Sequence, residues 1–423
     1  MSHKFVVFSL LVLALIASAC APAAAPEVQV VKETVVVQGT PQVKEVVKEV
    51  VKEVVQTKEV VKQVVVTPTS GPAGATPLPK GALTINGAGA TFPEPVYTEW
   101  RFAYPYVDPS VTINYQGVGS GGGKKAIADK TVDFAGSDSL LTQAEYDKTP
   151  NLQMFPTLAG AVVPIFNIKE ITSGLTLNGP VLADIYLGKV KKWNDPAIAK
   201  LNPDLKLPDR NITAVHRSDG SGTTEIFTKY LAAVSDEWKN GPKAGQSVEW
   251  PVDKSGNGVG GKGNAGVAAA VQNTPDSVGY VELSYAAANK IAFADMLNKA
   301  GKKLTANAET LQAAMTDYAG TFSDKLTVDS ISNGGSDKSW PIAGYTYMII
   351  PMELPADKTY GCAKPQKFLD FVYWALTDAA AGKRADELGY ATLPDAVRAK
   401  VFATLAKATC DGKPIDSMIA KAK

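Results

Sequence analysis

The segment 215–227 constrains most narrowly how this chain folds. It reads V-H-R-S-D-G-S-G-T-T-E-I-F, in which an apolar strand carries Arg217 and Asp219 through a Gly-rich turn into a helix that begins near Ser221. The first backbone N–H groups of a helix have no partner within it, and the helix dipole places partial positive charge there. Such a junction is either an ordinary capped helix start or one side of an oxyanion site, with the Arg217 guanidinium as a second set of donors.

Two further segments repeat this order of strand, Gly-rich turn and helix. The first reads L-T-I-N-G-A-G-A-T-F-P-E-P, and it offers the hydroxyl of Thr91 and the backbone amide of Phe92 just before a helix. In the second, I-N-Y-Q-G-V-G-S-G-G-G-K-K-A-I, Ser120 heads three glycines before a short helix predicted over 126–130. One such turn is a weak signal, because many strand-to-helix junctions look alike, but three in one chain favour a shared anion site with phosphate as the leading candidate.

Asp138 ends a fourth segment, V-D-F-A-G-S-D-S, which reads as a buried strand. This aspartate is either the N-cap of a following helix or a ligand group. A carboxylate repels an anion unless the anion carries a proton that the carboxylate accepts. Phosphate keeps one or two protons at neutral pH and sulfate keeps none. A site built on this carboxylate would therefore reject sulfate by ~10⁴-fold or more, because two buried acceptors would face each other.

Seven strings follow one another between about residue 82 and the C-terminus. They read G-A-G-A-T-F-P, N-Y-Q-G-V-G-S-G-G-G, V-D-F-A-G-S-D, I-Y-L-G-K-V-K-K-W, R-S-D-G-S-G-T, G-G-K-G-N-A-G-V and G-Y-V-E. In content and order they resemble the extracytoplasmic phosphate-binding protein, a substrate-binding lipoprotein of the phosphate-specific ABC transporter. The resemblance is specific because the strings are long and occur together.

The resemblance implies ligand residues and a function. Carried over position by position, the family's phosphate ligands fall on Thr91, Phe92 (through its backbone), Ser120, Asp138, Arg217, Ser221, Gly222 and Thr223. Asp219 would orient the binding arginine. The implied protein binds inorganic phosphate with high affinity outside the cytoplasmic membrane and delivers it to a membrane-embedded ABC permease with its ATPase subunits. It needs neither a cofactor nor a metal.

Strands and helices alternate after residue 82, with frequent Gly and Pro between them, which is typical of an α/β protein with mostly parallel sheets. Ligands in such sheets bind at the carboxyl ends of strands, where all four segments place their polar residues. The resemblance implies a two-lobe periplasmic-binding-protein-like fold of type II with the ligand between the lobes. Lobe I would comprise 82–158 and 341–423, and lobe II would comprise 159–340. Closure of the lobes would bury the anion.

The N-terminus predicts export. Residues 1–19 have a basic start, an apolar run over 5–16 and small residues before Cys20, which is the pattern of a signal peptide. Cys20 resembles a lipobox cysteine, although Ala17 stands where leucine is usual. Lipidation would anchor the chain to the membrane, in the periplasm or on the outer face of the cell; a plain signal peptide cut nearby and a retained anchor are the alternatives. The apolar run is short for a membrane span.

Residues 20–81 predict a lipid-anchored stalk and spacer. The unit K-E-V-V recurs within a stretch rich in Val, Lys, Glu and Gln, and a stretch of Pro, Gly, Thr and Ala over 67–80 follows it. The first stretch suits an extended or coiled-coil stalk, and the second suits a flexible linker. Together they would hold a soluble domain away from the membrane.

Cys362 and Cys410 remain as an even pair if Cys20 is lipidated, in a compartment where disulfides persist. Each lies beside a helical pattern, over 364–376 and 396–408 respectively. A disulfide would thus tie the start of one helix to the end of another. Two free buried thiols are the alternative.

Composition separates the function classes. The chain of 423 residues has a formal net charge of +1 and no basic run interleaved with aromatics, so we expect no nucleic-acid partner. Two histidines without ligand spacing disfavour a metal-dependent enzyme. The main rival is a secreted phosphate-ester hydrolase in which Ser221 is the nucleophile and His216 the base. A sulfate binder and a surface adhesion protein are weaker rivals. We predict a binding protein and not an enzyme.

Overall fold

The computed structural model describes residues 78–422. The predicted signal peptide, Cys20 and almost all of the predicted stalk and spacer lie outside these residues. None of the helices within 78–422 is both long and apolar enough to cross a lipid bilayer.

The described part of the chain contains a nine-stranded main sheet. In spatial order its strands are β2 (Val111–Gly117), β1 (Leu83–Gly89), β3 (Phe134–Ser137), β11 (Ala343–Pro351), β4 (Leu152–Asn167), β8 (Ser277–Glu282), β6 (Thr213–Arg217) and β7 (Gly258–Gly261), with β12 (Ala391–Thr392) beside β4. A small sheet contains β10 (Lys303–Leu304), β9 (Asp295–Leu297) and β5 (Thr176–Asn178), and a hairpin contains β13 (Thr409–Cys410) and β14 (Lys413–Pro414).

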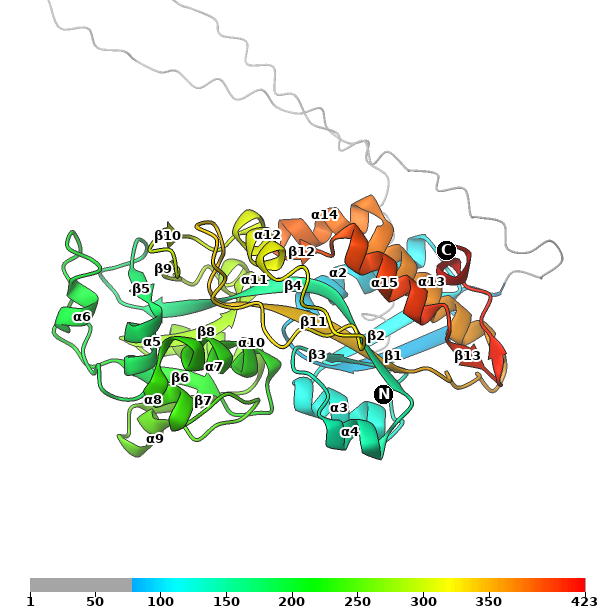
Figure 1. The fold of residues 1–423 in the computed structure, drawn as a ribbon, viewed down its shortest axis with the longest axis horizontal. Coiled ribbons are helices and arrows are strands. Elements are labelled where there is room, and N and C mark those ends of the chain that lie inside the picture. Colours follow the sequence, from blue (N-terminus) through cyan, green and yellow to red (C-terminus); the bar gives the residue numbers. More distant parts are fainter. Residues whose placement is uncertain (1–77, 423) are drawn as a thin grey trace, which may run out of the picture. The chain divides into compact units, whose positions relative to one another are not determined.

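Helices follow most of these strands. They are α2 (Glu94–Ala103), α3 (Ser120–Ala128), α4 (Gln143–Lys148), α5 (Gly179–Tyr186), α6 (Pro196–Ala199), α7 (Gly222–Val234), α8 (Asp236–Asn240), α9 (Pro251–Lys254), α10 (Gly263–Asn273), α11 (Leu283–Ala288), α12 (Ala308–Asp317), α13 (Ala363–Thr377), α14 (Ala379–Glu387), α15 (Asp395–Leu405) and α16 (Met418–Lys421), with a 3-10 turn at Tyr104–Tyr106. Figure 1 shows α2, α13, α14 and α15 on one side of β1, β2 and β3, and α3 and α4 on the other.

The main sheet is mixed, whereas the sequence favours mostly parallel strands. One parallel set contains β2, β1 and β3, and the other contains β7, β6 and β8. Between them β11 and β4 run antiparallel to each other and to their outer neighbours. β4 pairs with β11 up to Ala161 and with β8 from Val162 onward, so one long strand belongs to both sets (Figure 1). The boundaries predicted for the lobes fall within β4 and just ahead of β11.

The burial of each strand follows from its residue pattern. In β1, the buried Leu83 and Ile85 alternate with the exposed Thr84 and Asn86, and β2 at the edge of the sheet alternates in the same way. Such alternation is typical of a strand with one solvated face. β8 is buried at every position, which fits its place between two other strands and under helices.

Helix α3 begins earlier than the sequence predicts. We expected a helix over 126–130, but α3 begins at Ser120 and contains all three glycines. Their poor helix propensity is offset by close packing, because a Cβ on Gly123 would lie 2.6 Å from Gly89 Cα and 2.8 Å from the Gly136 carbonyl oxygen. Gly123 therefore lets α3 lie directly on β1 and β3.

Stacked aromatic side chains form the core on both sides of the paired strands β4 and β11. Phe134 of β3 lies between Tyr115 and Phe368, with ring centroids 5.9 and 5.3 Å away, so it holds α13 against β2 and β3. Phe227 of α7 stacks on Tyr280 of β8 at 4.1 Å. Such pairs add about 0.5–1.5 kcal/mol each to the area that they bury.

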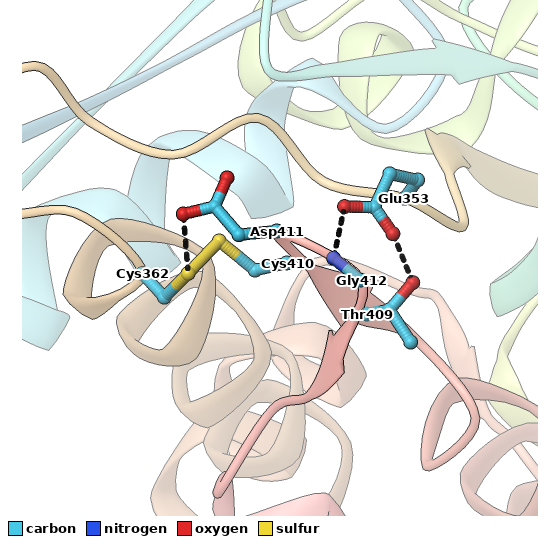
Figure 2. The surroundings of a disulfide bond; sticks show 6 residues. All are labelled: Glu353, Cys362, Thr409, Cys410, Asp411 and Gly412. Carbon is cyan, nitrogen blue, oxygen red and sulfur yellow. Dashed lines mark hydrogen bonds between the residues drawn. A yellow bond between two sulfur atoms is a disulfide. The ribbon is translucent and has the colours of Figure 1, made fainter.

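A disulfide joins Cys362, just before α13, to Cys410, just after α15 (Figure 2). The Cα atoms of the two cysteines are 5.8 Å apart. Beside the bridge, the Glu353 carboxylate accepts hydrogen bonds from the Thr409 hydroxyl and, at 3.0 Å, from the Gly412 amide. The C-terminal helices are thereby fixed to each other and to the segment after β11.

Removing the disulfide should destabilise the fold. The bridge closes a loop with a sequence separation of 48 residues. On the chain-entropy model it lowers the entropy of the unfolded chain by an amount that corresponds to about 4 kcal/mol. We expect the double variant Cys362→Ser, Cys410→Ser to lose that order of unfolding free energy in a denaturant titration. Reduced wild-type protein is the control and should match the variant; a variant as stable as the oxidised wild type would contradict the prediction.

Candidate functional site

Ser120 joins the end of β3 to the start of α7, the helix that follows β6. Its Oγ accepts a hydrogen bond from the backbone amide of Asp138, at 3.1 Å, and another from the backbone amide of Gly222, also at 3.1 Å. The same hydroxyl lies 3.5 Å from Asp138 Oδ2, to which it donates. The start of α3, the end of β3 and the start of α7 therefore meet at one hydroxyl.

Asp138 is a buried carboxyl and not a helix cap. The helix that follows, α4, is capped instead by Thr142, whose side chain accepts from the Glu145 amide in a capping box. Asp138 Oδ1 accepts a hydrogen bond of 2.8 Å from the Thr346 hydroxyl of β11. Burial raises the pKa of Asp138 to about 7, although the Thr346 hydrogen bond and the Arg217 charge act in the opposite direction. A carboxyl with this pKa exchanges a proton near neutral pH.

Arg217 and Asp219 form a buried bidentate ion pair. The arginine Nε lies 2.7 Å from Asp219 Oδ1, and its Nη2 lies 2.6 Å from Oδ2. Oδ1 also accepts from the Gly263 amide at 3.0 Å. Burial alone would raise the pKa of Asp219, but these bonds and the Arg217 charge hold it below its usual range. Because Asp219 takes up one edge of the guanidinium, the remaining N–H groups around Nη1 are directed elsewhere.

The backbone of Arg217 is fixed as well. Its amide donates to the Tyr280 hydroxyl at 3.2 Å, and that hydroxyl shares a 2.7 Å hydrogen bond with Thr224 of α7. The neighbouring strand and helix therefore both hold the residue that carries the positive charge of the site.

The start of α7 is capped by Ser221 and packs so closely at Gly222 that no side chain fits there. Ser221 is the N-cap, and its Oγ accepts from the Thr224 amide at 3.0 Å. A Cβ on Gly222 would lie 2.6 Å from Ser120 Oγ and 2.7 Å from Asp138 Oδ2. Only glycine lets the backbone of α7 approach these two groups.

Thr91 and Thr223 are brought together by a residue that our sequence reasoning missed. Asn264 Nδ2 donates to Thr91 Oγ1 at 2.9 Å and to Thr223 Oγ1 at 3.2 Å, and its backbone amide donates to Thr91 Oγ1 at 3.1 Å. Thr223 Oγ1 also accepts from Arg217 Nη1 at 3.5 Å. A signal was available, because Asn264 follows another strand and Gly-rich turn in the first turn of a helix.

Phe92 lies beside these residues in the chain and is held by its backbone. Its carbonyl oxygen accepts a 2.7 Å hydrogen bond from the Tyr390 hydroxyl. Among the hydrogen bonds of residues 78–422, none joins Phe92 to the other seven predicted ligands. The only link between Phe92 and the other predicted ligands is therefore that it follows Thr91 in the chain, and its role through the backbone amide stays a prediction.

The Ser221 and His216 pair of the hydrolase alternative is not formed. The His216 ring uses Nε2 to contact Asp253 Oδ1 at 2.8 Å and Nδ1 to contact the Arg217 carbonyl oxygen at 3.1 Å. The same ring stacks on Trp250 at 4.8 Å. Because Ser221 caps α7, the hydrogen bonds of both side chains go to other partners.

Glu282 is a second buried carboxyl near the site. Its Oε2 accepts from the Ser284 amide at 3.0 Å and from the Ser284 hydroxyl, and it lies 2.8 Å from the Tyr390 hydroxyl oxygen, whose single hydrogen is shared with the Phe92 carbonyl oxygen. Oε1 has no hydrogen-bond partner among the described residues. Burial raises the pKa of Glu282 to about 8, and the nearby charge of Asp138 acts in the same direction.

Within residues 78–422, the only group of three His, Cys, Asp or Glu side chains close enough to share a metal ion is Cys362, Cys410 and Asp411. Its two cysteines are joined in the disulfide. Cys410 and Asp411 lie in the C-terminal hairpin and Cys362 lies just before α13, and none of the three belongs to the predicted anion site.

The stability of the ligand-free protein should fall as pH rises through neutrality. Asp138 and Glu282 have higher pKa values in the folded protein than in the unfolded chain, so between about pH 5 and about pH 8 the unfolded chain binds fewer protons. Ionisation there favours the unfolded chain. We expect Asp138→Asn and Glu282→Gln each to flatten this decline in the unfolding free energy, measured by urea titration across that range.

The matched control for this pH series is Glu249→Gln, because the Glu249 side chain is 90% exposed. It should leave the slope of unfolding free energy against pH unchanged. Wild-type stability that stays level or rises across the range, or parallel slopes in all four proteins, would contradict the assignment of the two raised pKa values.

Comparisons with known proteins agree on one family. The family model described as "PBP superfamily domain" matches residues 69–378. The phosphate-binding protein PstS of Pasteurella multocida is 43% identical over 326 residues, which are 76% of this chain and 90% of that protein. The phosphate-binding protein PstS of Xylella fastidiosa (strain Temecula1) is 42% identical over 316 residues, which are 74% of this chain and 82% of that protein.

A solved structure shares the fold. The crystal structure of a phosphate binding protein from Stenotrophomonas maltophilia matches with a TM-score of 0.58 and 22% identity, over 80% of this chain and 99% of that one. The predicted α/β, periplasmic-binding-protein-like fold class is confirmed.

Proposed function

Because this chain belongs to the PBP superfamily and, within it, to the PstS family of phosphate-binding proteins, we propose that it binds inorganic phosphate outside the cytoplasmic membrane and delivers it to an ABC permease for import. The observation that carries the proposal is the convergence of one oriented guanidinium, several hydroxyl and amide groups and one carboxyl. Arg217 supplies charge, the helix starts supply donors, and Asp138 is the acceptor. A permease with ATPase subunits is the partner that such delivery requires.

The phosphate is proposed to lie between two lobes, 82–158 with 341–423 and 159–340. Contacts across this division support the proposal, because the Gly222 amide donates to Ser120 and the Gly121 amide donates to the Gly220 carbonyl oxygen at 3.1 Å. The two parallel strand sets joined by β4 and β11 fit a hinge there. The proposed ligands are the eight predicted from the resemblance: Thr91, Phe92, Ser120, Asp138, Arg217, Ser221, Gly222 and Thr223.

Each group has a proposed task. Asp219 orients the guanidinium of Arg217, so the arginine presents its free edge to the anion. The hydroxyls of Thr91 and Thr223 donate to phosphate oxygens. Ser120 has a single hydroxyl hydrogen, which it donates to Asp138 in the ligand-free protein and turns to a phosphate oxygen in the complex. The Asp138 carboxylate accepts a hydrogen bond from the proton that phosphate still carries. Sulfate has no proton to offer, so its oxygen would face the carboxylate without a hydrogen bond.

Replacing Asp138 tests this proton-reading mechanism. Asp138→Asn keeps the size of the side chain and presents an amide, which is able to donate to a bare oxygen. We expect weaker phosphate binding and a preference for phosphate over sulfate that falls by ~100-fold or more, measured by calorimetric titration after bound ligand has been dialysed away.

Asp219→Asn is the matched control, because it loosens Arg217 and should weaken both anions by similar factors. Unchanged selectivity in Asp138→Asn would refute the mechanism. Failure of the wild-type protein to bind phosphate at all would refute the proposed function itself.

Phosphate-ester hydrolysis is not proposed. No hydrogen bond within residues 78–422 links the Ser221 hydroxyl to a base, and His216 is occupied by Asp253 and the Arg217 carbonyl oxygen. The family relatives bear the name of binding proteins. We therefore propose a receptor and not an enzyme.

Tethering to the membrane is proposed to run through a lipid on Cys20, with residues 1–19 removed and 20–81 as stalk and spacer. An acyl chain contributes about 0.8 kcal/mol of membrane affinity for each buried CH₂ group. We expect cells fed a labelled fatty acid to label the wild-type protein and not Cys20→Ser. Cys362→Ser is the control and should be labelled like the wild type. Label on Cys20→Ser, or none on the wild type, would contradict the anchor.

A further inference from the structure

Asn264 has a defined hydrogen-bond partner for every polar group of its side chain. The residue is fully buried in the first turn of α10. Its Oδ1 accepts from the Glu282 amide at 3.0 Å, while Nδ2 donates to Thr91 at 2.9 Å and to Thr223 at 3.2 Å. These partners lie outside α10, so the Asn264 side chain does not cap the helix in which it lies.

The orientation of this amide follows from the Glu282 backbone. A backbone N–H only donates, so it must face the oxygen of the Asn264 amide and not the nitrogen. Nδ2 is then fixed at the opposite end, toward the two threonines. Its two hydrogens match the two hydroxyl oxygens that lie there.

A count of lone pairs decides what the hydroxyls do next. A threonine hydroxyl has one hydrogen to donate and two lone pairs that accept. Thr91 Oγ1 accepts from both the backbone amide and Nδ2 of Asn264. Thr223 Oγ1 accepts from Asn264 Nδ2 and from Arg217 Nη1. Both hydroxyls have thus filled their acceptor capacity, and their hydrogens remain for another acceptor.

We propose that Asn264 is a positioning residue that makes Thr91 and Thr223 obligatory donors to the bound anion. The inference rests on the proposed function, because it needs a phosphate in reach of both threonines. A phosphate oxygen without a proton only accepts, so two hydroxyls that can only donate are matched to it. Asn264 also spans the proposed division of the chain, since Thr91 belongs to lobe I and Thr223 to lobe II. It therefore acts when the lobes are closed.

The tasks of Asn264 and Asp138 are complementary. Asn264 turns hydroxyls into donors, which serve phosphate and sulfate alike. Asp138 is the acceptor that reads the proton. Loss of Asn264 should therefore reduce phosphate affinity by a different route from loss of Asp138, and the effect should pass through the threonine hydroxyls.

A double-mutant cycle in the full chain tests this. We expect Asn264→Ala to weaken inorganic phosphate by ~10-fold or more in calorimetric titration, because the released hydroxyls no longer have a fixed direction. Asn264→Asp should weaken it further, by ~100-fold or more, because a carboxylate would accept the hydroxyl hydrogens and repel the anion. In a Thr91→Val, Thr223→Val background, Asn264→Ala should cost less than ~2-fold.

The single-threonine backgrounds sharpen the test. The Asn264 backbone amide still bonds Thr91 when the side chain is removed. Thr223→Val should therefore cancel more of the Asn264→Ala effect than Thr91→Val does. A merely structural role would move the thermal unfolding midpoint of the ligand-free protein and would show no such dependence on the threonines.

The outcomes separate the two proposals. If the wild type binds phosphate but Asn264→Ala binds equally well, or loses affinity by the same factor in the double-valine background, the positioning role is overturned while the proposed function stands. If the wild type binds no phosphate, both fall together. Coupling between Asn264 and the threonines, with a ligand-free midpoint close to that of the wild type, supports the role.

Discussion

The ion pair between Arg217 and Asp219 organises the site around it. A buried guanidinium is costly unless it is paired, and here one carboxylate accepts from both Nε and Nη2. The same carboxylate accepts from the Gly263 amide and therefore fixes the start of α10, where Asn264 lies. A Cβ on Gly119 would lie 2.4 Å from Asp219 Oδ2, so the start of α3 also packs against this pair. Two helix starts, those of α10 and α3, thus pack against one ion pair.

Around this pair the polar groups divide into donors and one acceptor. Helix N-termini supply backbone amides, and the partial positive charge there adds to that of Arg217. Asn264 occupies both lone pairs of the Thr91 hydroxyl and, together with Arg217, those of the Thr223 hydroxyl, so the hydrogens of both remain free. Asp138 is the exception, because it is a carboxyl among donors, and its Oδ1 accepts a hydrogen bond from the Thr346 hydroxyl. A site with many donors suits oxyanions in general, whereas the single acceptor favours one that still carries a proton.

The burial of these polar groups also has a cost. Asp138 and Glu282 are both withdrawn from water, which raises the pKa of each, and one oxygen of Glu282 has no partner among the described residues. Burial without full compensation reduces stability. The surrounding structure offsets this through aromatic stacks such as Phe227 on Tyr280 and through the disulfide that closes the C-terminal region. Binding sites commonly carry such local costs, because a group satisfied by its own protein has less to offer a ligand.

Short local patterns in the sequence were sufficient to predict several features of this protein. The alternation of strands, Gly-rich turns and helices predicted the α/β class. The strings of residues at these turns predicted the family and the role of Asp219 in orienting Arg217. Such features depend on neighbours in the chain, so they are legible without a structure. The disulfide between Cys362 and Cys410 was only partly predictable. The even number of remaining cysteines favoured it, but the folded structure is what brings the two sulfur atoms together.

Tertiary structure alone decided the contacts between distant segments. It made the sheet mixed, because β4 and β11 run antiparallel between the two parallel sets. It began α3 at Ser120, where Gly123 packs on β1 and β3, and it placed Asn264 between two threonines that lie more than a hundred residues apart in the sequence. The physical reason is the same throughout: hydrogen-bond partners and close packing between segments remote in sequence are set by the folded arrangement, and no periodicity or local motif encodes them.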